Sequence, residues 1–422
     1  MSEICNYSIW GNYFIKLKNN FFIISKYSYL KFLKEELLIL IKILKIKGPY
    51  WTSALCFHLA YLVLFIFYKN KKIWLIMDRQ DRADDNAEHL YNYMIDINDT
   101  KNKYFVISND SKDYSRLSSI WKNVLEFYSI KHRILYLFSD KVISSQADEI
   151  IVNPFWDKNI KWYSGLLTGD KIFLQHGVAK DDMSNWLRKY DKNVKLLVTT
   201  SELEANSFDD YEYHYAEGVV QVLGLPRYDH LSNESNNKQI LIMPSWRRSL
   251  INADEIQIQK SEYFLRFNSL INNERFINIA KSLGYKIIFK PHPNTFEFIE
   301  LFDTNDYVII DENSKYQDLF NNSSLLITDY SSLAFDFAYI KKPIIYYQYG
   351  DDYHFGNNFF VYESMGFGEV IRDEDELIDT IKEYLNNDCE IKDMYLKRSN
   401  SFYKFNDKNN CKRVYDSIKK IK

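Results

Sequence analysis

Two histidines in this chain follow buried strands at points where they could take part in a reaction. His176 comes after the apolar run 172–174, in the segment KIFLQHGVAKDD, and Gly177 follows it directly. A histidine with its ordinary pKa of about 6.5 can accept a proton from a hydroxyl group near neutral pH. Gly177 leaves the backbone open to close approach by a large group. The alternative interpretation is a turn that carries an imidazole without a catalytic role.

The second histidine, His292, lies in KIIFKPHPN with a proline on each side. Pro291 and Pro293 restrict the backbone around it, so its imidazole is a pre-organised hydrogen-bond donor. A plain surface turn is the alternative. Both histidines therefore stand as candidate catalytic residues.

A helix start and an arginine add groups that favour an anion. In LLITDYSSLAFDFAYIKKP, a buried strand runs into Asp329-Tyr330-Ser331-Ser332, and a helix is expected to begin near Leu333. The free N–H groups of such a helix start favour phosphate, although Ser and Asp also serve as plain caps. Arg247 follows another strand, in MPSWRRS, and its guanidinium suits phosphate oxygens. A surface arginine pair is the alternative there.

These groups together predict a cleft for a diphosphate, because all of them stand at strand ends. The chain has neither a Walker P-loop nor a GxGxxG pattern. The ligand predicted is therefore a nucleotide-linked donor in place of ATP or NAD. The adjacent carboxylates at 181–182 and 351–352 are interpreted as solvated loop residues, so we expect no required metal and no cofactor.

The elements that must position these groups form an α/β pattern from residue 73 onward. Strand-like runs alternate with helical stretches, which predicts two parallel sheets with helices on both faces. Ligands of such sheets sit beyond the carboxyl ends of the strands. A polar stretch at 232–237 marks the boundary between the sheets. The strand-like runs are 73–77, 104–108, 141–145, 171–175, 196–200 and 220–224, followed by 239–244, 286–291, 307–311, 324–328 and 343–347.

The first 72 residues differ from the rest in charge. They contain eleven lysines, no arginine and three glutamates, so their net charge is +8, and the remainder carries −11 of the total of −3. The spacing predicts an amphipathic helix over 32–48. The apolar run 54–67 is shorter than the roughly 20 residues that span a bilayer. It is either a buried helix or an interfacial helix on an anionic membrane.

Length and cysteine content limit the remaining possibilities. A chain of 422 residues predicts two domains, and the net-acidic body argues against nucleic acid as a partner. The four cysteines are scattered, which indicates free thiols in a reducing compartment, and the start of the chain shows no secretory signal. The predicted domains are a basic helical membrane-association segment (1–72), two Rossmann-like domains (73–230 and 231–388) and a C-terminal helical segment (389–422).

The chain resembles the CDP-glycerol glycerophosphotransferase family, the teichoic-acid primases and polymerases and related capsule enzymes. The resemblance covers residues 73–420, and Gln146 departs from it because the family often has a histidine there. The blocks that carry the resemblance are MDRQDRADDNAEHLY, ISSQADEIIVNPF, FLQHGVAKDDMSNWL, GLPRYD, ILIMPSWR, KPHPN, ITDYSSLAFDFAYIKKPIIYY and FNDKNNCKRVYDSI.

The resemblance implies a GT-B-like fold, in which two Rossmann-like domains face each other across a cleft. It implies attack of an acceptor hydroxyl on the β-phosphorus of CDP-glycerol, with CMP leaving and His176 as the general base. Gly177 would give room at the cleft wall. The diphosphate would be held by His292, Arg247, Ser331 and Ser332.

Other residues keep two interpretations each. Asp336 and Asp329 either orient the glycerol hydroxyls or simply cap and pair. Asp84, Asp85 and Asn86 lie on the acceptor side, where they contact the acceptor or form a solvated turn. The resemblance also implies peripheral attachment to the cytoplasmic face of the membrane and a lipid-linked glycan or polyol-phosphate acceptor.

Three rival functions remain open at this point. CDP-ribitol could replace CDP-glycerol as the donor, because ribitol enzymes share these blocks. A sugar transferase or nucleotide-sugar epimerase could use the same two-domain fold. An inactive membrane-bound scaffold is the third, and the presence of both His176 and His292 argues against it.

Overall fold

The computed structural model describes short pieces of the chain before residue 46 and one long stretch from residue 51 to 421 with short gaps. Asp351, Asp352 and most of the predicted helix over 32–48 lie outside the described residues. The described positions of that helix are helical. The structure describes residues 5–9, 12–17, 20–26, 34, 37–38, 41–42, 45, and 51–421 apart from 158–159, 164, 211, 235–236, 304 and 351–358.

Seven parallel strands form the larger sheet, in the order β10-β9-β8-β7-β4-β5-β6. Alternate residues of the central strand β4 enter different cores: Trp74 and Ile76 pack on one face, Ile73 and Leu75 on the other. Helices therefore cover both faces, as the apolar run predicts. We call this sheet and its helices the N-terminal lobe. Its strands are β4 (Ile73–Met77), β5 (Asn102–Ile107), β6 (Val124–Glu126), β7 (Ser139–Ser144), β8 (Asp170–Phe173), β9 (Val194–Thr199) and β10 (Val220–Val222). Its helices are α3 (Asn86–Asp96), α4 (Lys112–Ile120), α5 (Ile130–Leu137), α6 (Glu149–Val152), α7 (Lys189–Lys192) and α8 (Glu202–Asp210).

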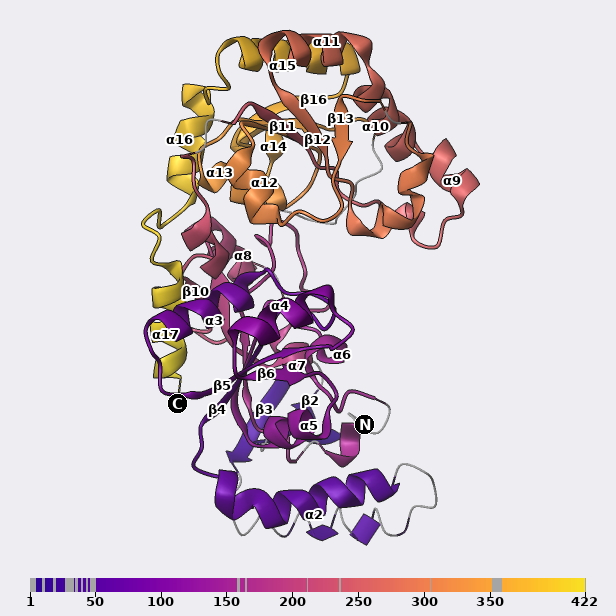
Figure 1. Cartoon of the computed structure of the whole chain (residues 1–422). Coiled ribbons are helices and arrows are strands. Elements are labelled where there is room, and N and C mark those ends of the chain that lie inside the picture. Colours follow the sequence, from indigo (N-terminus) through magenta and orange to yellow (C-terminus); the bar gives the residue numbers. More distant parts are fainter. Residues whose placement is uncertain are drawn as a thin grey trace.

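Six parallel strands form the second sheet, in the order β13-β12-β11-β14-β15-β16, and belong to the C-terminal lobe (Figure 1). Its strands are β11 (Gln239–Ile242), β12 (Lys286–Phe289), β13 (Val308–Ile310), β14 (Leu325–Thr328), β15 (Ile344–Tyr347) and β16 (Gly368–Ile371). Its helices are α9 (Glu255–Lys260), α10 (Glu262–Asn272), α11 (Glu274–Leu283), α12 (Tyr316–Asn322), α13 (Leu333–Tyr339), α14 (Tyr362–Met365) and α15 (Glu374–Asn386).

The order of strands reverses once in each sheet. In the N-terminal lobe the reversal lies between β4 and β7, and in the C-terminal lobe it lies between β11 and β14. Such a reversal opens a crevice beyond the carboxyl ends of the two strands. The predicted parallel α/β fold is confirmed, and each predicted run from residue 73 onward forms a strand. The sequence analysis missed the short strands β6 and β16.

The first residues form strands, which corrects the prediction of a wholly helical segment over 1–72. Three antiparallel strands lie there: β1 (Cys5–Ile9), β2 (Asn12–Leu17) and β3 (Asn20–Lys26). Aromatic and β-branched residues, as in NYFIKL, favour strands. Helix α2 (Trp51–Tyr68) follows and matches the predicted apolar run. Within the described part of the chain, no helix has the length and apolar character needed to cross a membrane.

The C-terminal helices connect the two lobes. Helix α16 (Asp393–Phe402) lies beside the C-terminal lobe, and α17 (Asn410–Lys420) returns to pack on α3 of the N-terminal lobe (Figure 1). The carboxylate of Asp229, in the short 3-10 helix η2 (Pro226–His230), accepts hydrogen bonds from the backbone N–H groups of Asn410 and Cys411, each at 2.8 Å. One hydrophobic core consequently runs through both lobes. Among the described side chains, Cys56, Cys389 and Cys411 are free thiols.

Two glycines offer a direct test of how α17 is seated. Gly224 and Gly218 both have left-handed backbones, with φ of +79° and +82°. A Cβ atom at Gly224 would overlap the side chain of Asn410 on α17, whereas one at Gly218 would meet nothing within 4 Å. We expect Gly218→Ala to cost about 1–2 kcal/mol of unfolding free energy through backbone strain alone. Gly224→Ala should cost about 1–3 kcal/mol more, because the overlap adds to the same strain.

Urea unfolding followed by circular dichroism measures both changes in stability. Equal losses in the two variants would show that the contact between Gly224 and α17 contributes nothing to the stability of the protein.

Candidate active site between the lobes

The segment that carries His176 turns sharply after β8. Gln175 adopts a left-handed backbone, with φ of +61°, which is unusual for a residue other than glycine. Its side-chain amide donates to the Val198 carbonyl at 2.6 Å and to a carboxylate oxygen of Glu204 at 2.9 Å. The same Glu204 oxygen accepts from the Ala179 N–H at 2.8 Å, so one buried carboxylate holds both ends of the turn. The result is a strained turn that presents His176 to solvent.

Gly177 is the point where this turn meets the other lobe. A Cβ atom at Gly177 would lie 2.7 Å from the hydroxyl oxygen of Ser332. The room predicted at Gly177 is therefore occupied in this structure by Ser332 of the C-terminal lobe. Two predicted site segments, far apart in the sequence, are thereby brought together.

The imidazole of His176 stays neutral near pH 7. Although solvent reaches the side chain, the surrounding protein removes enough water to lower its pKa below 6.5. The carboxylate of Asp85 raises this pKa, and the guanidinium groups of Arg227 and Arg79 lower it. A neutral imidazole at the lip of the cleft can accept a proton.

His292 is held as a hydrogen-bond donor at the end of β12. Its Nδ1 accepts from the Asn294 N–H at 3.2 Å, so the neutral ring carries its proton on Nε2. Burial lowers its pKa to about 4, with the charges of Arg82 and Arg79 adding to the effect and Asp329 opposing it. The ring also stacks on Trp246, with centroids 6.3 Å apart. The structure thus gives His292 the fixed geometry expected from its flanking prolines.

Arg247 and Asp329 form a buried ion pair instead of facing the cleft. The guanidinium donates to Asp329 at 2.7 Å, and the two side chains are 3% and 0% exposed. The other oxygen of Asp329 accepts from the backbone N–H of Ser245 at 2.8 Å and from its hydroxyl at 2.7 Å. These contacts tie the end of β11 to the end of β14, at the strand reversal. In this structure the guanidinium of Arg247, which was expected to hold the diphosphate, binds a carboxylate. Asp329 shows the pairing that was one of its two interpretations.

The two serines lie where α13 begins. Ser331 accepts from the backbone N–H of Leu333 at 3.3 Å and so caps the helix. Ser332 makes no capping bond with its side chain and lies against Gly177. Both are half-buried. The hydroxyl of Ser332 is therefore placed toward the turn that carries His176.

Arg227, which received no role in the sequence analysis, joins the two lobes. It lies in η2, inside the block GLPRYD, and is 6% exposed. It donates to both oxygens of Asp336, at 2.6 and 2.9 Å, and to Asp85 at 2.5 Å. It also donates to the backbone carbonyl of His176 at 2.9 Å. A buried guanidinium thus joins the His176 turn to helix α13.

For Asp336 the structure shows the pairing that was one of its two interpretations. The side chain is 2% exposed and both of its oxygens are taken by Arg227, so the pairing interpretation holds. The charge of Arg227 opposes the effect of burial, which raises the pKa of Asp336 above its usual range. The sequence signal was present in GLPRYD, but an arginine and an aspartate so far apart give no local pattern.

Two aspartates and an asparagine at 84–86 also contact both sides of the junction between the lobes. Asp84 pairs with Lys315 of the C-terminal lobe at 2.8 Å. Asn86 donates to the Gln175 carbonyl at 2.7 Å and accepts from the Arg227 N–H at 3.1 Å. These contacts argue against a fully solvated turn, and contact with the acceptor stays a prediction.

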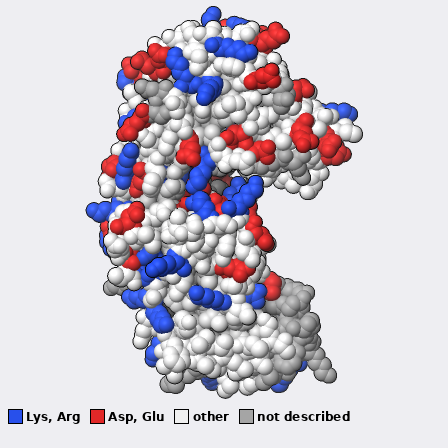
Figure 2. Space-filling view, in the orientation of Figure 1, with Lys and Arg blue, Asp and Glu red and all other residues white. Residues whose placement is uncertain are grey.

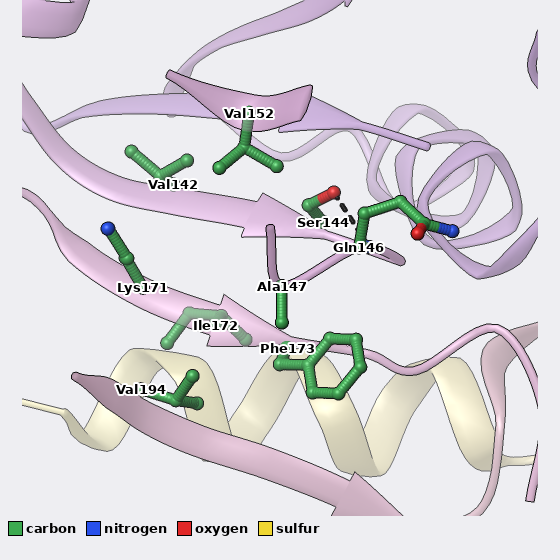
Figure 3. Close-up of a pocket in the computed structure, with 9 residues that line it drawn as sticks. All are labelled: Val142, Ser144, Gln146, Ala147, Val152, Lys171, Ile172, Phe173 and Val194. Carbon is green, nitrogen blue, oxygen red and sulfur yellow. Dashed lines mark hydrogen bonds between the residues drawn. The ribbon is translucent and has the colours of Figure 1, made fainter. Parts of the chain in front are cut away.

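A small cavity in the N-terminal lobe lies apart from these residues (Figure 3). It has room for about one water molecule. Ser144 in its wall accepts from the N–H of Gln146, the residue that departs from the family pattern, at 3.0 Å. None of the predicted site residues lines this cavity, and it is too small for a nucleotide.

The fold and the site together define a two-lobed α/β protein whose candidate site lies at the junction of the lobes. Figure 2 shows the molecule hollowed between the lobes, with Lys and Arg side chains on the wall of the hollow. The chain belongs to the CDP-glycerol:poly(glycerophosphate) glycerophosphotransferase family, whose model matches residues 58–420.

Known proteins are similar to this chain in sequence and in fold. The chain is 46% identical over 365 residues to the minor teichoic acid biosynthesis protein GgaB of Bacillus subtilis, a match that covers 84% of this chain and 40% of GgaB. The chain thus spans less than half the length of this relative. In fold it is similar to the wall teichoic acid polymerase TagF, with a TM-score of 0.65 at 18% identity over 92% of this chain and 97% of that one. It is also similar to UDP-GlcNAc 2-epimerase from Neisseria meningitidis, with a TM-score of 0.51 at 12% identity over 82% and 99%.

The network around Arg227 generates a stability prediction. Arg227→Met should lower the unfolding free energy by about 3–5 kcal/mol, because it leaves the buried carboxylate of Asp336 without its partner. The double variant Arg227→Met/Asp336→Leu should recover part of that loss, since the buried carboxylate of Asp336 is no longer left without a partner. Urea unfolding of the two variants and the wild type measures both changes.

A matched surface arginine serves as the control for this experiment. Arg275 is 47% exposed and pairs with Asp379, which is 63% exposed. Arg275→Met should change stability by less than about 1 kcal/mol. Similar small losses at Arg227 and Arg275 would contradict the central role of Arg227.

Proposed function

We propose that this chain transfers glycerol phosphate, or a related polyol phosphate, from a CDP-linked donor to a hydroxyl of a membrane-linked acceptor. CMP is the leaving group, and the product belongs to a teichoic-acid or capsule-type polymer. The observation that carries the proposal is the meeting of the His176–Gly177 turn with Ser332 across the two lobes. Membership of the glycerophosphotransferase family and the similarity to GgaB support it.

The chemistry assigns one task to each lobe. On the N-terminal lobe, neutral His176 accepts the proton of the attacking hydroxyl. That hydroxyl oxygen forms a bond to the β-phosphorus of CDP-glycerol, and the bond from this phosphorus to the oxygen of CMP breaks. On the C-terminal lobe, His292 donates from Nε2 to the phosphate oxygens, and Ser331 and Ser332 contact them near the start of α13. Transfer of this type depends on positioning and on stabilising charge.

The lobes also divide the two substrates. We assign residues 231–388 to the CDP donor, because His292, Ser331 and Ser332 follow strands of that sheet at or beside its strand reversal. Residues 73–230 bind the acceptor, because His176 must lie beside the hydroxyl that it deprotonates.

The surface of α2 supports attachment to the cytoplasmic face of an anionic membrane. One face of this helix packs on the N-terminal lobe through Ala54, His58 and Tyr61, which are buried. The opposite face exposes apolar side chains, and lysines follow the helix. A helix with this arrangement lies in the headgroup region of a bilayer. The exposed residues are Leu59 (50%), Leu62 (39%), Val63 (66%), Ile66 (75%) and Phe67 (65%), and the exposed lysines are Lys69, Lys71 and Lys72.

CMP release tests the catalytic part of the proposal. We expect purified protein with lipid-linked acceptors to release CMP from CDP-glycerol or from CDP-ribitol, and the donor that is used decides between them. His176→Ala should lower the rate by at least about 100-fold, because it removes the general base. His214→Ala is the matched control, since His214 is an exposed histidine of the same lobe.

The pH dependence separates a base from a residue with a structural role. The lowered pKa keeps His176 neutral at and above pH 6.5, so kcat/KM should fall only as the pH drops below that value. Equal loss of CMP release in the two histidine variants would contradict the assignment of His176. Release of a sugar and UDP from a UDP-sugar, in place of CMP from a CDP donor, would favour the sugar transferase.

Vesicle binding tests the membrane part of the proposal separately. The variant Val63→Asp/Ile66→Asp should lose at least about 90% of its co-sedimentation with vesicles that contain 30% phosphatidylglycerol, because carboxylates oppose burial in the headgroup region. The matched variant Ile256→Asp/Leu265→Asp changes exposed apolar residues of the C-terminal lobe and should bind as the wild type does. Unchanged binding by the α2 variant would refute this role for α2.

A further inference from the structure

Two arginines near the active site have no task in the transfer described above. Arg79 and Arg82 lie in the loop that follows β4, with side chains 46% and 41% exposed. Asp81 lies 3.5 Å from Arg79 and 3.7 Å from Arg82, and it is itself 64% exposed. Within the described residues, no carboxylate other than that of Asp81 lies within 4.0 Å, the distance of an ion pair, of either guanidinium group. Two guanidinium groups therefore share one exposed carboxylate, which leaves a net positive charge.

The loop that carries the arginines is fixed by its neighbours. The Arg79 N–H donates to the Arg82 carbonyl at 3.2 Å, which closes the turn. The hydroxyl of Ser111 donates to the Asp81 carbonyl at 2.8 Å. The side chain of Gln80 donates to the Ile150 carbonyl at 2.8 Å. The backbone of both arginines is thus held in place before any ligand binds.

The position of this loop in the sheet is the one where a ligand is expected. The strand order of the N-terminal lobe reverses between β4 and β7, so the crevice opens beside this loop. The usual seat for an anion there, the start of α3, is filled by the protein itself. The buried carboxylate of Asp78 accepts from the N–H groups of Asp85, Ala87 and Glu88, at 3.1, 2.8 and 3.1 Å. An anion at this crevice must therefore be bound outside the helix start, where the arginines lie.

The positive charges of the arginines reach titratable groups of both lobes. Their charges act on His292 and Tyr316 of the C-terminal lobe, and the charge of Arg79 acts on His176 as well. Figure 2 shows basic side chains on the wall of the hollow between the lobes. The two guanidinium groups thus stand at the open side of the site, within electrostatic reach of the candidate base.

We propose that Arg79 and Arg82 bind a phosphate group of the acceptor, close to the hydroxyl that attacks. This inference rests on the proposed function and names the acceptor class, a phosphate-bearing chain or anchor. The acceptor is favoured over the donor because the arginines follow a strand of the same sheet as His176. The groups that face the donor diphosphate come from the other sheet. The fork of a guanidinium group matches two oxygens of a phosphate.

Steady-state kinetics with two kinds of acceptor test this proposal. The double variant Arg79→Ala/Arg82→Ala should raise KM for a phosphate-bearing acceptor at least about tenfold and change KM for the CDP donor less than about twofold. KM for a phosphate-free glycan acceptor should not change. Arg79→Lys/Arg82→Lys should give an intermediate KM, because lysine keeps the charge but lacks the fork. Arg275→Ala, which removes an exposed arginine of the C-terminal lobe, is the matched control.

The two sources of such a phosphate are separated by the choice of acceptor. A glycerol-phosphate oligomer carries only chain phosphodiesters, and a lipid-linked disaccharide carries only the anchor diphosphate. A raised KM for the first assigns the arginines to the growing chain, and a raised KM for the second assigns them to the anchor. A KM that rises equally for the donor, or for the phosphate-free glycan, would overturn the proposal.

Acceptor binding without turnover keeps this test independent of the proposed function. Calorimetry with the glycerol-phosphate oligomer and with the lipid-linked disaccharide, in the absence of donor, compares the wild type with the double alanine variant. The affinity of the variant for at least one of them should be at least about tenfold lower, with a weaker dependence on salt. Equal affinities of both proteins for both acceptors would overturn the inference even if CMP is released. Absence of CMP release with intact acceptor binding would instead count against the proposed function.

Discussion

The contacts of the buried Arg227 guanidinium are the interactions on which the arrangement of the two lobes depends. It contacts Asp336 in the C-terminal lobe, and Asp85 and the backbone of His176 in the N-terminal lobe. Charges so deeply buried are tolerated only when each is paired, so the parts of the two lobes next to Arg227 stay in contact. The His176 turn and helix α13 are therefore held together by one side chain. Arg227 lies in η2, between the last strand of one sheet and the first strand of the other, and from there it reaches Asp336, Asp85 and the His176 carbonyl.

An aspartate follows a strand at the reversal in each sheet, but the two aspartates have different partners. In each lobe an aspartate follows a strand at the reversal and accepts backbone hydrogen bonds from elsewhere in the lobe. Asp78 fills the start of α3 and closes that seat to ligands. Asp329 instead binds Arg247 and Ser245, and it leaves Ser332 without a capping bond. The strand reversal of each sheet thus holds an aspartate, which closes the start of α3 in one lobe and binds Arg247 in the other.

The parallel α/β fold and the residues at its strand ends could be predicted from the sequence, because strands and their carboxyl ends are local properties of the chain. The apolar runs placed His176, His292 and Ser332 at strand ends, and the structure confirms those positions. The partners of Arg247 and Asp336 could not be predicted, since their ion pairs join residues distant in sequence and a charged residue gives no sign of its own burial. The strands before residue 27 were missed because their lysines and apolar residues also fit a helical interpretation.

The return of α17 to the N-terminal lobe has a mechanical consequence. The chain crosses between the lobes at η2 and again before α17, and these two connections are joined through Asp229. Two adjacent connections define an axis, so the easiest relative motion is a rotation about the line of the crossings. Such a rotation opens the cleft most on the side far from the two crossings and changes the region next to the crossings little. The side chains next to the crossings then keep their contacts, and those farthest from the crossings move most.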